Sequence, residues 1–402
     1  MFEEMSNMQI IRPMNFAALG LGAAFVVVWG AVAPTMAFAE IMTVEADDTY
    51  LMGDGMEERM DVAQTMAIAK ATQRAAEKAG VFVESFSATQ MGSITQDEVR
   101  AISATVLEVQ EPVKVIPEVV AGGQAIRYHA YVVAVVDTSN ISRILSQGSA
   151  NNEDIVRKNK EYEEELAKVH AEIERLREEY RQASESEKQR INEEVKQNEN
   201  EFMANEREHQ GWQWYRKGLL YDLMAGGHPD YNKAMEYYQK AIEIYPECDF
   251  AWARMGEIYD EWGNLDKAIE CKQKALAYNS HPEPIIVGLA WFNIGRLFDK
   301  AGNYEEAIEH YQKAVEIFDY VMAWNNMGVI YNNQENYEKA LECLQRATQI
   351  DAKRAVCWNN LGTVYWNLNL YRDALTAYEH ALALDPDNAQ YKKDRDDAAA
   401  KL

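Results

Sequence analysis

Two stretches near the end of the chain, residues 323–333 and 357–367, share the order tryptophan, two asparagines, an apolar residue and glycine. Asparagine is a middling helix former that prefers caps and turns. Paired asparagines inside a helical pattern therefore point to a role other than helix stability. A carboxamide carries both donors and an acceptor, so it can pair with a peptide bond in both directions. A row of such groups could hold an extended polypeptide by its backbone.

Patterns typical of catalysis or metal binding are missing from the sequence. It has no nucleophile elbow and no paired histidines at ligand spacing, and the glycines at 53–55 and 121–123 lack the following helix of a phosphate loop. Four cysteines have no C-x-x-C spacing, and we interpret them as small buried thiols: Cys248, Cys271, Cys343 and Cys357. Cys343 and Cys357 are expected on neighbouring helices, so their pairing stays open. We expect no enzyme, cofactor, metal or small-molecule substrate.

The composition allows two or three domains and limits the class of partner. The chain has 402 residues, of which 48% are hydrophobic, so a large buried core is possible. It carries 65 acidic and 40 basic residues, a formal net charge of −25. Such a surface repels phosphate backbones, which argues against nucleic acid as a partner.

The first 39 residues resemble an export signal in the order of their charged, apolar and small residues. Arg12 precedes an apolar run over 16–32, and Pro34 and the Ala37-Phe38-Ala39 site follow it. This order is typical of a secretory signal peptide cut after Ala39. An uncleaved membrane anchor is the alternative, because residues 14–39 could span a bilayer. We expect a protein exported to the periplasm or cell envelope.

Residues 40–148 mix strand and helix signals. An extended segment to residue 53 is followed by an alanine-rich helix over 57–78 with Gly80 as its C-cap, and 81–90 alternates like a strand. Thr95 and Glu98 form a capping box that opens a short helix. Two β-rich runs, 105–120 and 125–137, flank a turn signal. The order predicts an α+β domain with helices on one face of a small antiparallel sheet.

A heptad pattern runs through the charged segment 150–210. Its apolar positions follow one another at alternating steps of four and three: Tyr162, Leu166, Val169, Ile173, Leu176, Tyr180 and Ala183. We interpret the segment as a coiled-coil stalk, a long helix that associates in parallel with other copies. The alternatives are a solvated spacer and an antiparallel hairpin folding at 184–186.

From residue 211 the chain repeats itself five times. Each repeat has a tryptophan four residues before a glycine and an aromatic residue three after it, with two alanines seven residues apart further on. The glycines are Gly218, Gly256, Gly295, Gly328 and Gly362. One such unit cannot bury its own faces, so several must stack.

This pattern is identified as that of the tetratricopeptide repeat family. The resemblance implies five helix pairs over 211–387, stacked as an all-α superhelix with a concave groove, and a C-terminal capping helix over 388–402. Residues 40–148 resemble the N-terminal domain of flagellar assembly protein T, which implies a role in envelope or appendage assembly.

The family resemblance also implies which residues face the groove. In the order of the repeats these are peptide-binding candidates: Arg216, Arg254, Asn293, Arg296, Asn325, Asn326, Asn333, Asn359, Asn360 and Asn367. The asparagines resemble the ladder of O-linked N-acetylglucosamine transferases, and the arginines resemble the cations of carboxylate-clamp domains. Apolar neighbours could add side-chain selectivity: Phe250, Leu289, Met322 and Val356.

Two functions follow as hypotheses. In the first, an exported scaffold binds an extended segment of another protein through an asparagine ladder, and oligomerisation through 150–210 multiplies its sites. In the second, the chain is a structural or assembly component of the bacterial envelope or of a surface appendage. That component would act through the stalk and the N-terminal domain.

Overall fold

The computed structural model describes residues 41–53, 56–90, 94–120, 125–137, 149–222, 229–279 and 283–402, with residues 140, 141 and 144. The predicted signal peptide, its cleavage site and the alternative anchor over 1–39 lie outside these residues. So does the predicted turn at 121–124. None of the described helices combines the length and the apolar character needed to cross a membrane.

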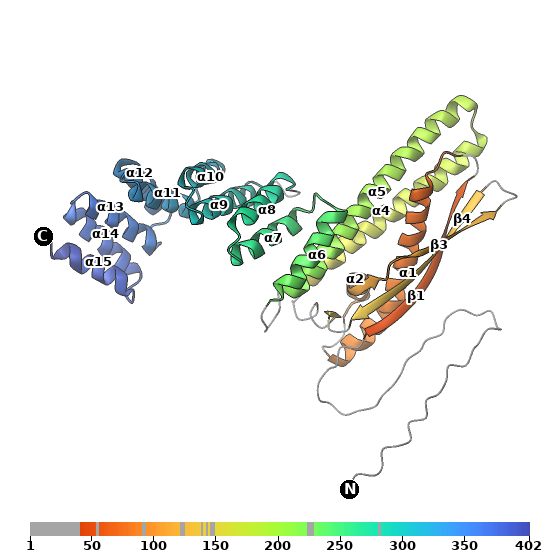
Figure 1. The fold of residues 1–402 in the computed structure, drawn as a ribbon, viewed down its shortest axis with the longest axis horizontal. Coiled ribbons are helices and arrows are strands. Elements are labelled where there is room, and N and C mark those ends of the chain that lie inside the picture. Colours follow the sequence, from red (N-terminus) through yellow and green to blue (C-terminus); the bar gives the residue numbers. More distant parts are fainter. Residues whose placement is uncertain are drawn as a thin grey trace, which may run out of the picture. The chain divides into compact units, whose positions relative to one another are not determined.

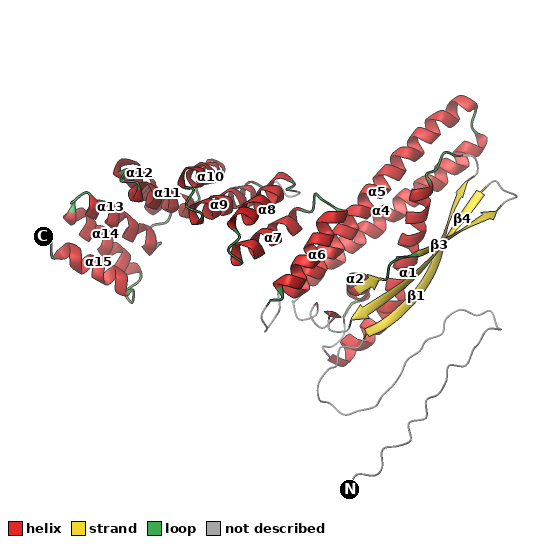
Figure 2. Ribbon diagram, viewed as in Figure 1, coloured by secondary structure: helices red, strands yellow, loops and turns green. Residues whose placement is uncertain are grey.

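A small antiparallel sheet is built around its longest strand, β4 (Ala125–Asp137). One edge of β4 pairs with β1 (Ile41–Gly53), and the other pairs with β2 (Leu107–Val109) and β3 (Lys114–Val120). Alternate β4 residues are buried against α1 (Met60–Gln90), among them Val132 and Val136. Figure 2 shows this helix lying along the sheet. The α+β arrangement is as predicted.

The prediction of a strand over 81–90 is wrong, because these residues belong to helix α1. Instead of ending at Gly80, the helix runs on to Gln90. A row of buried residues at steps of four continues across the glycine: Ala71, Ala75, Ala79, Val83 and Ser87. Gly80 is a contact point rather than a cap, because a Cβ there would lie 3.3 Å from Val99 of α2 (Gln96–Val106). The capping box of Thr95 and Glu98 is present at the start of α2.

Residues 150–210 form two antiparallel helices, not the long single helix that the heptad pattern suggested. They are α4 (Ser149–Gln182) and α5 (Glu185–Asp222), which lie side by side in Figure 1. Ser184 starts α5, since Glu187 accepts hydrogen bonds from both its backbone nitrogen (2.8 Å) and its hydroxyl (2.6 Å). The apolar seam is covered within the chain, with Leu176 packed against Ile191 and Val195. Oligomerisation therefore stays a prediction, and the seam no longer supports it.

A buried ion pair fastens α4 to the segment before α1. Arg177 is 5% exposed, and its Nε and Nη2 donate to the two carboxylate oxygens of Glu58, each at 2.8 Å. The same guanidinium donates to the Tyr50 hydroxyl at 3.1 Å and to the Leu51 carbonyl. Burial raises the pKa of Tyr50 above its ordinary value, and Arg177 opposes this rise. Arg177 thus links strand β1 to the helical hairpin, and the Tyr50 ring also contacts the His170 ring of α4.

Helix α5 continues without a break into the first repeat, so the predicted boundary at residue 211 lies inside it. Lys217 of this helix is buried and donates from Nζ to the Leu107 carbonyl at 2.8 Å. Burial lowers the pKa of Lys217 to about 8. The first repeat is therefore packed directly against the α+β region.

The repeats are successive helix pairs. The end of α5 pairs with α6 (Tyr231–Ile244), α7 (Asp249–Glu261) with α8 (Leu265–Ala277), and α9 (Pro284–Lys300) with α10 (Tyr304–Ile317). Next, α11 (Val321–Asn333) pairs with α12 (Tyr337–Ile350), and α13 (Ala355–Asn367) with α14 (Tyr371–Leu384). Helix α15 (Ala389–Ala399) packs on α14, where a capping helix was expected.

The repeated glycines set the distance between the two helices of each pair. A Cβ at Gly218 would lie 2.4 Å from the Tyr238 ring, and one at Gly362 would lie 2.6 Å from the Tyr378 ring. Gly295 is related to Tyr311 in the same way. Each glycine thus accepts a large side chain of the second helix, a close fit typical of protein interiors.

We expect Gly218→Ala to destabilise the chain by about 1–3 kcal/mol, because the Tyr238 ring is fully buried and its hydroxyl is bonded to Asp222 at 2.8 Å. Urea unfolding followed by circular dichroism measures the change. Gln273→Ala on the exposed side of α8 is the control and should leave the midpoint unchanged. Equal midpoints for both variants would contradict the close fit.

Arg177→Ala should lower the free energy of unfolding by about 3–5 kcal/mol, because it leaves the Glu58 carboxylate buried without a cation. The matched control is Arg175→Ala on the same helix, whose partners Glu172 and Glu179 are partly exposed. That substitution should cost less than about 1 kcal/mol. Similar losses in denaturant unfolding would show that the buried pair has no special role.

Candidate functional site

Bridging side chains place the first helices of successive repeats next to one another. Arg254 of α7 bonds to Asp222 of α5, Arg296 of α9 to Asp260 of α7, and Asn360 of α13 to Asn325 of α11. We call the surface formed by α7, α9, α11, α13 and the end of α5 the inner face. It carries the predicted peptide-binding residues.

The three predicted arginines are engaged with the chain itself. Arg254 donates to Asp222 through Nε at 2.7 Å, and Arg296 donates to Asp260 at 2.9 Å. Arg216 is buried, with its guanidinium 5.7 Å from the centre of the Trp212 ring. Each of these two arginines neutralises a carboxylate of the preceding repeat. That carboxylate, Asp222 or Asp260, stands four residues after the glycine of its own repeat.

Five polar side chains, three of them predicted asparagines, form a hydrogen-bonded chain across three repeats, which we call the amide chain. Asn360 Nδ2 donates to Asn325 Oδ1 at 2.9 Å, and Asn325 Nδ2 donates to Asn326 Oδ1 at 3.2 Å. Asn326 Nδ2 then donates to the Tyr311 hydroxyl at 3.2 Å. The hydroxyl donates to Asp299 Oδ2 at 3.4 Å, so a carboxylate ends the chain.

Asp299 fixes the direction of the amide chain, because an ionised carboxylate only accepts hydrogen bonds. The Tyr311 hydroxyl must therefore donate its proton to Asp299, and its oxygen accepts a hydrogen bond from Asn326. Each remaining amide likewise donates to the next side chain on the path toward Asp299. Asn360 Oδ1 then receives no donor from the described residues. Asp299 has the repeat position of Asp222 and Asp260, but no cation of the described chain pairs with it. Burial raises the pKa of Asp299, whereas hydrogen bonds from Lys300 and Arg296 outweigh burial and lower the pKa of Asp260.

The remaining predicted asparagines differ in their availability. Asn367 Nδ2 donates to Asn332 Oδ1 at 2.9 Å, and the buried Oδ1 of Asn359 has no partner among the described residues. Asn293 is half-buried and Asn333 is exposed, and neither amide bonds to another group in the described part of the chain. Asn325, by contrast, is 4% exposed and serves only the amide chain. Asn293 and Asn333 therefore have the most freedom to bind a guest.

Sequence reasoning missed Asp299 and Tyr311. Nothing in the sequence analysis singled out Tyr311, whose hydroxyl joins the amide chain to the carboxylate. A comparison of the positions four residues after each glycine would have found Asp299, since Asp222 and Asp260 share that position and have arginine partners in the next repeat.

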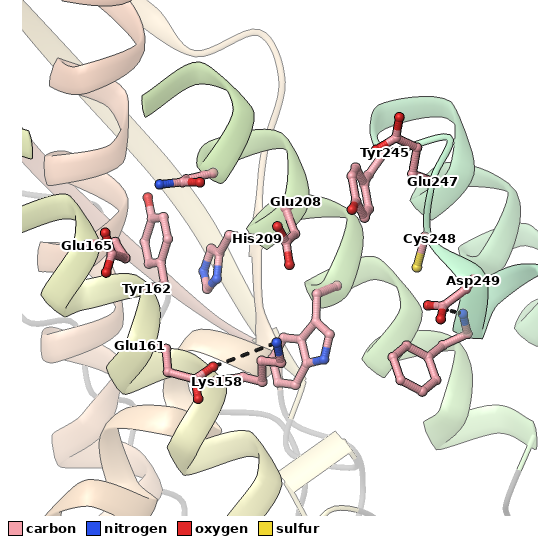
Figure 3. Close-up of a pocket in the computed structure, with 13 residues that line it drawn as sticks. Lys158, Glu161, Tyr162, Glu165, Glu208, His209, Tyr245, Glu247, Cys248 and Asp249 are labelled. Carbon is pink, nitrogen blue, oxygen red and sulfur yellow. Dashed lines mark hydrogen bonds and ion pairs between the residues drawn. The ribbon is translucent and has the colours of Figure 1, made fainter. Parts of the chain in front are cut away.

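A cavity of about 340 Å³ lies between α4, α5 and the start of α7. Aromatic rings and acidic side chains line most of it, namely Tyr162, His209, Trp212, Tyr245 and Phe250 with Glu161, Glu165, Glu208, Glu247 and Asp249. Figure 3 shows Glu208 and His209 between Tyr162 on one side and Tyr245 on the other. Lys158 is the one cation among its lining residues, and Glu161 lies 3.7 Å away. No local pattern in the sequence could reveal this cavity, because its residues come from distant segments.

His209 forms part of the cavity wall in its neutral form. Its ring is stacked on Tyr162 with centroids 3.6 Å apart, and its Nε2 accepts from the Gln213 amide at 2.8 Å. Burial lowers the pKa of His209 to about 3. The Tyr162 hydroxyl donates to Glu206, whose pKa burial raises.

The pKa of His209 predicts a loss of stability in acid. Its folded-state pKa lies below the ordinary 6.5, so the unfolded chain takes up this proton first as the pH falls. The stabilising contribution is complete above pH 6.5, and about 1–2 kcal/mol of it should be lost by pH 5. His209→Gln should remove this part of the pH dependence, measured as the difference between the two proteins in urea unfolding at both pH values. Parallel pH profiles would contradict it.

The comparisons with known proteins concern the C-terminal half. Family models described as tetratricopeptide repeat match residues 214–248, 251–282, 288–319 and 319–387. Over 47 residues the chain is 47% identical to the mitochondrial import receptor subunit TOM70 of Rattus norvegicus and 45% identical to that of Homo sapiens. The matched stretch covers 12% of this chain and 8% of those receptors.

Solved structures show the same kind of likeness. The MamA structure is 21% identical with a TM-score of 0.36, covering 40% of this chain and 92% of that one. YrrB, described as a tetratricopeptide protein with an unusual peptide-binding site, is 23% identical with a TM-score of 0.36, covering 42% and 84%. The family matches coincide with the helix pairs and glycine contacts described above. The family matches therefore show that residues 214–387 of this chain are a tetratricopeptide repeat region.

Proposed function

We propose that the chain is a protein–protein interaction scaffold whose inner face binds an extended segment of a partner protein. One observation carries this proposal: the inner face presents carboxamides and a carboxylate oxygen for which the described residues provide no partner. Asn293 and Asn333 offer both donors and acceptors, while Asn360 Oδ1 and Asp299 offer acceptors. A polypeptide backbone supplies the complementary groups at regular intervals.

The amide chain supports this proposal by fixing its members before a partner arrives. Asn326, Asn325 and Asn360 are held by one another and by Tyr311, so little side-chain freedom is lost when a guest binds to Asn360. Half-buried apolar side chains on the same helices would contact the guest's side chains, among them Met322 and Val356. The proposed export to the periplasm or envelope would place this face among other exported proteins.

Asn293→Ala with Asn333→Ala should weaken peptide binding by about 1–3 kcal/mol, because two hydrogen bonds to the guest are lost. Neither amide bonds within the described chain, so the unfolding midpoint should not change. The ligand is a peptide selected from a random display library on the wild-type chain, and its affinity is measured by calorimetry.

Gln273→Ala with Gln312→Ala is the control for this experiment, since it removes two exposed carboxamides from the second helices α8 and α10. Its affinity should equal that of the wild type. Methylating backbone nitrogens of the selected peptide should weaken binding to the wild type and should matter less to the Asn293→Ala, Asn333→Ala variant. Full affinity of that variant would refute binding by these amides.

A further inference from the structure

The cavity between α4, α5 and α7 combines aromatic walls with an acidic lining. Glu208 and Glu247 form no ion pair or hydrogen bond with the described residues, and both are exposed at its edge. Asp249 lies beside them and accepts a hydrogen bond from the Phe250 backbone nitrogen at 2.8 Å. Figure 3 shows Glu208, Glu247 and Asp249 on the side of the cavity formed by α5 and the start of α7.

The charge of this site is strongly one-sided. Five acidic side chains line the cavity, and Lys158 stands on the α4 side with Glu161. Burial, and then the nearby Glu208, Glu247 and Asp249, raise the pKa of Tyr245 to about 12. Burial, and then Asp249 and Glu208, likewise raise the pKa of Cys248 to about 12. The carboxylates that line the cavity, rather than its burial, therefore favour a positive charge there.

The walls are suited to a flat cation. Tyr245, Trp212 and Phe250 contribute aromatic rings, which attract cations at their faces. The chain itself uses this contact at its tryptophans, with Lys274 Nζ 4.2 Å from the centre of the Trp252 ring and Arg216 5.7 Å from that of Trp212. A guanidinium can stack on such rings and bond to a carboxylate with two nitrogens, which an ammonium cannot do.

We propose that this cavity binds an arginine side chain carried by the partner segment that lies on the inner face. This inference rests on the proposed function, because that function supplies the bound segment that carries the arginine. Phe250 connects the two surfaces, because it lines the cavity and is the second residue of α7 on the inner face. Its ring centroid lies 5.7 Å from that of Tyr215. The volume, about 340 Å³, is in the range of known ligand sites. The net charge of −25 matches a basic partner.

The test is calorimetric titration of the full chain with two peptides of Gly and Ser that carry one central residue, either arginine or its neutral isostere citrulline. We expect the arginine peptide to bind at least about tenfold more tightly, with a preference that shrinks at high salt because exposed carboxylates take part. Equal affinities would overturn the proposal. Tetramethylammonium binding as tightly as the arginine peptide would assign the cavity to free organic cations and would also overturn it.

Glu208→Gln with Glu247→Gln should weaken arginine-peptide binding about five- to tenfold and leave the citrulline peptide unaffected. Both residues are exposed and unpaired, so the variant should fold with the wild-type unfolding midpoint. Glu338→Gln with Glu342→Gln on α12 makes the same change of charge away from the cavity and is the matched control. Equal effects of the two double variants would show only a general charge attraction and refute the site.

The variants also separate this proposal from the peptide-binding function. Loss of the cavity carboxylates should leave binding of an arginine-free selected peptide to the inner face intact. The Asn293→Ala, Asn333→Ala variant should instead weaken both peptides and retain the preference for arginine over citrulline. A preference that disappears with the asparagines would place the arginine on the inner face and overturn its assignment to the cavity.

Discussion

Helix α5 is the constraint on which the rest of the structure depends. It is one unbroken helix whose first half packs on α4 and whose second half packs in the first repeat. Its first half covers the apolar seam of α4, with Ile191 and Val195 buried. Its second half supplies Gly218 and Tyr221 to the first repeat and Lys217 to the α+β region. Residues of α5 also line the cavity, together with residues of α4 and of the start of α7. The repeat region is thus anchored through a helix that starts outside it.

The inner face changes its chemistry along the array. The first repeats join neighbouring helices with ion pairs, as at Asp222 and Arg254, and the last repeats use amides, as at Asn325 and Asn360. Ion pairs satisfy both members, whereas amides keep spare donors and acceptors after they pair. The repeat that holds Asp299 lies at the transition between these two regimes. The amides proposed to bind the partner's backbone therefore lie in the last three repeats.

The repeats and the capping box of α2 could be predicted from sequence, because their signals are local: fixed spacings from each glycine, and Thr95 three residues before Glu98. Tertiary contacts decided the rest. Gly80 has the signal of a helix end, yet its missing side chain lets Val99 approach. The heptads over 150–183 specify a partner helix without saying whether it lies in another copy or in α5. The direction of the amide chain depends on Asp299, which is two repeats from Asn360.

The alignment of the amide chain has a consequence for how its two ends respond to a guest. All its dipoles point the same way, so each hydrogen bond polarises the next one along it. A group that donates to Asn360 Oδ1 makes the Tyr311 proton bond more strongly to Asp299 and reduces the charge left on that carboxylate. A cation bound to Asp299 would weaken that carboxylate as an acceptor, and it would thereby reduce the polarisation of every amide back to Asn360. Occupancy at one end thus makes the other a poorer acceptor, an electronic antagonism transmitted over three repeats without any movement of the backbone.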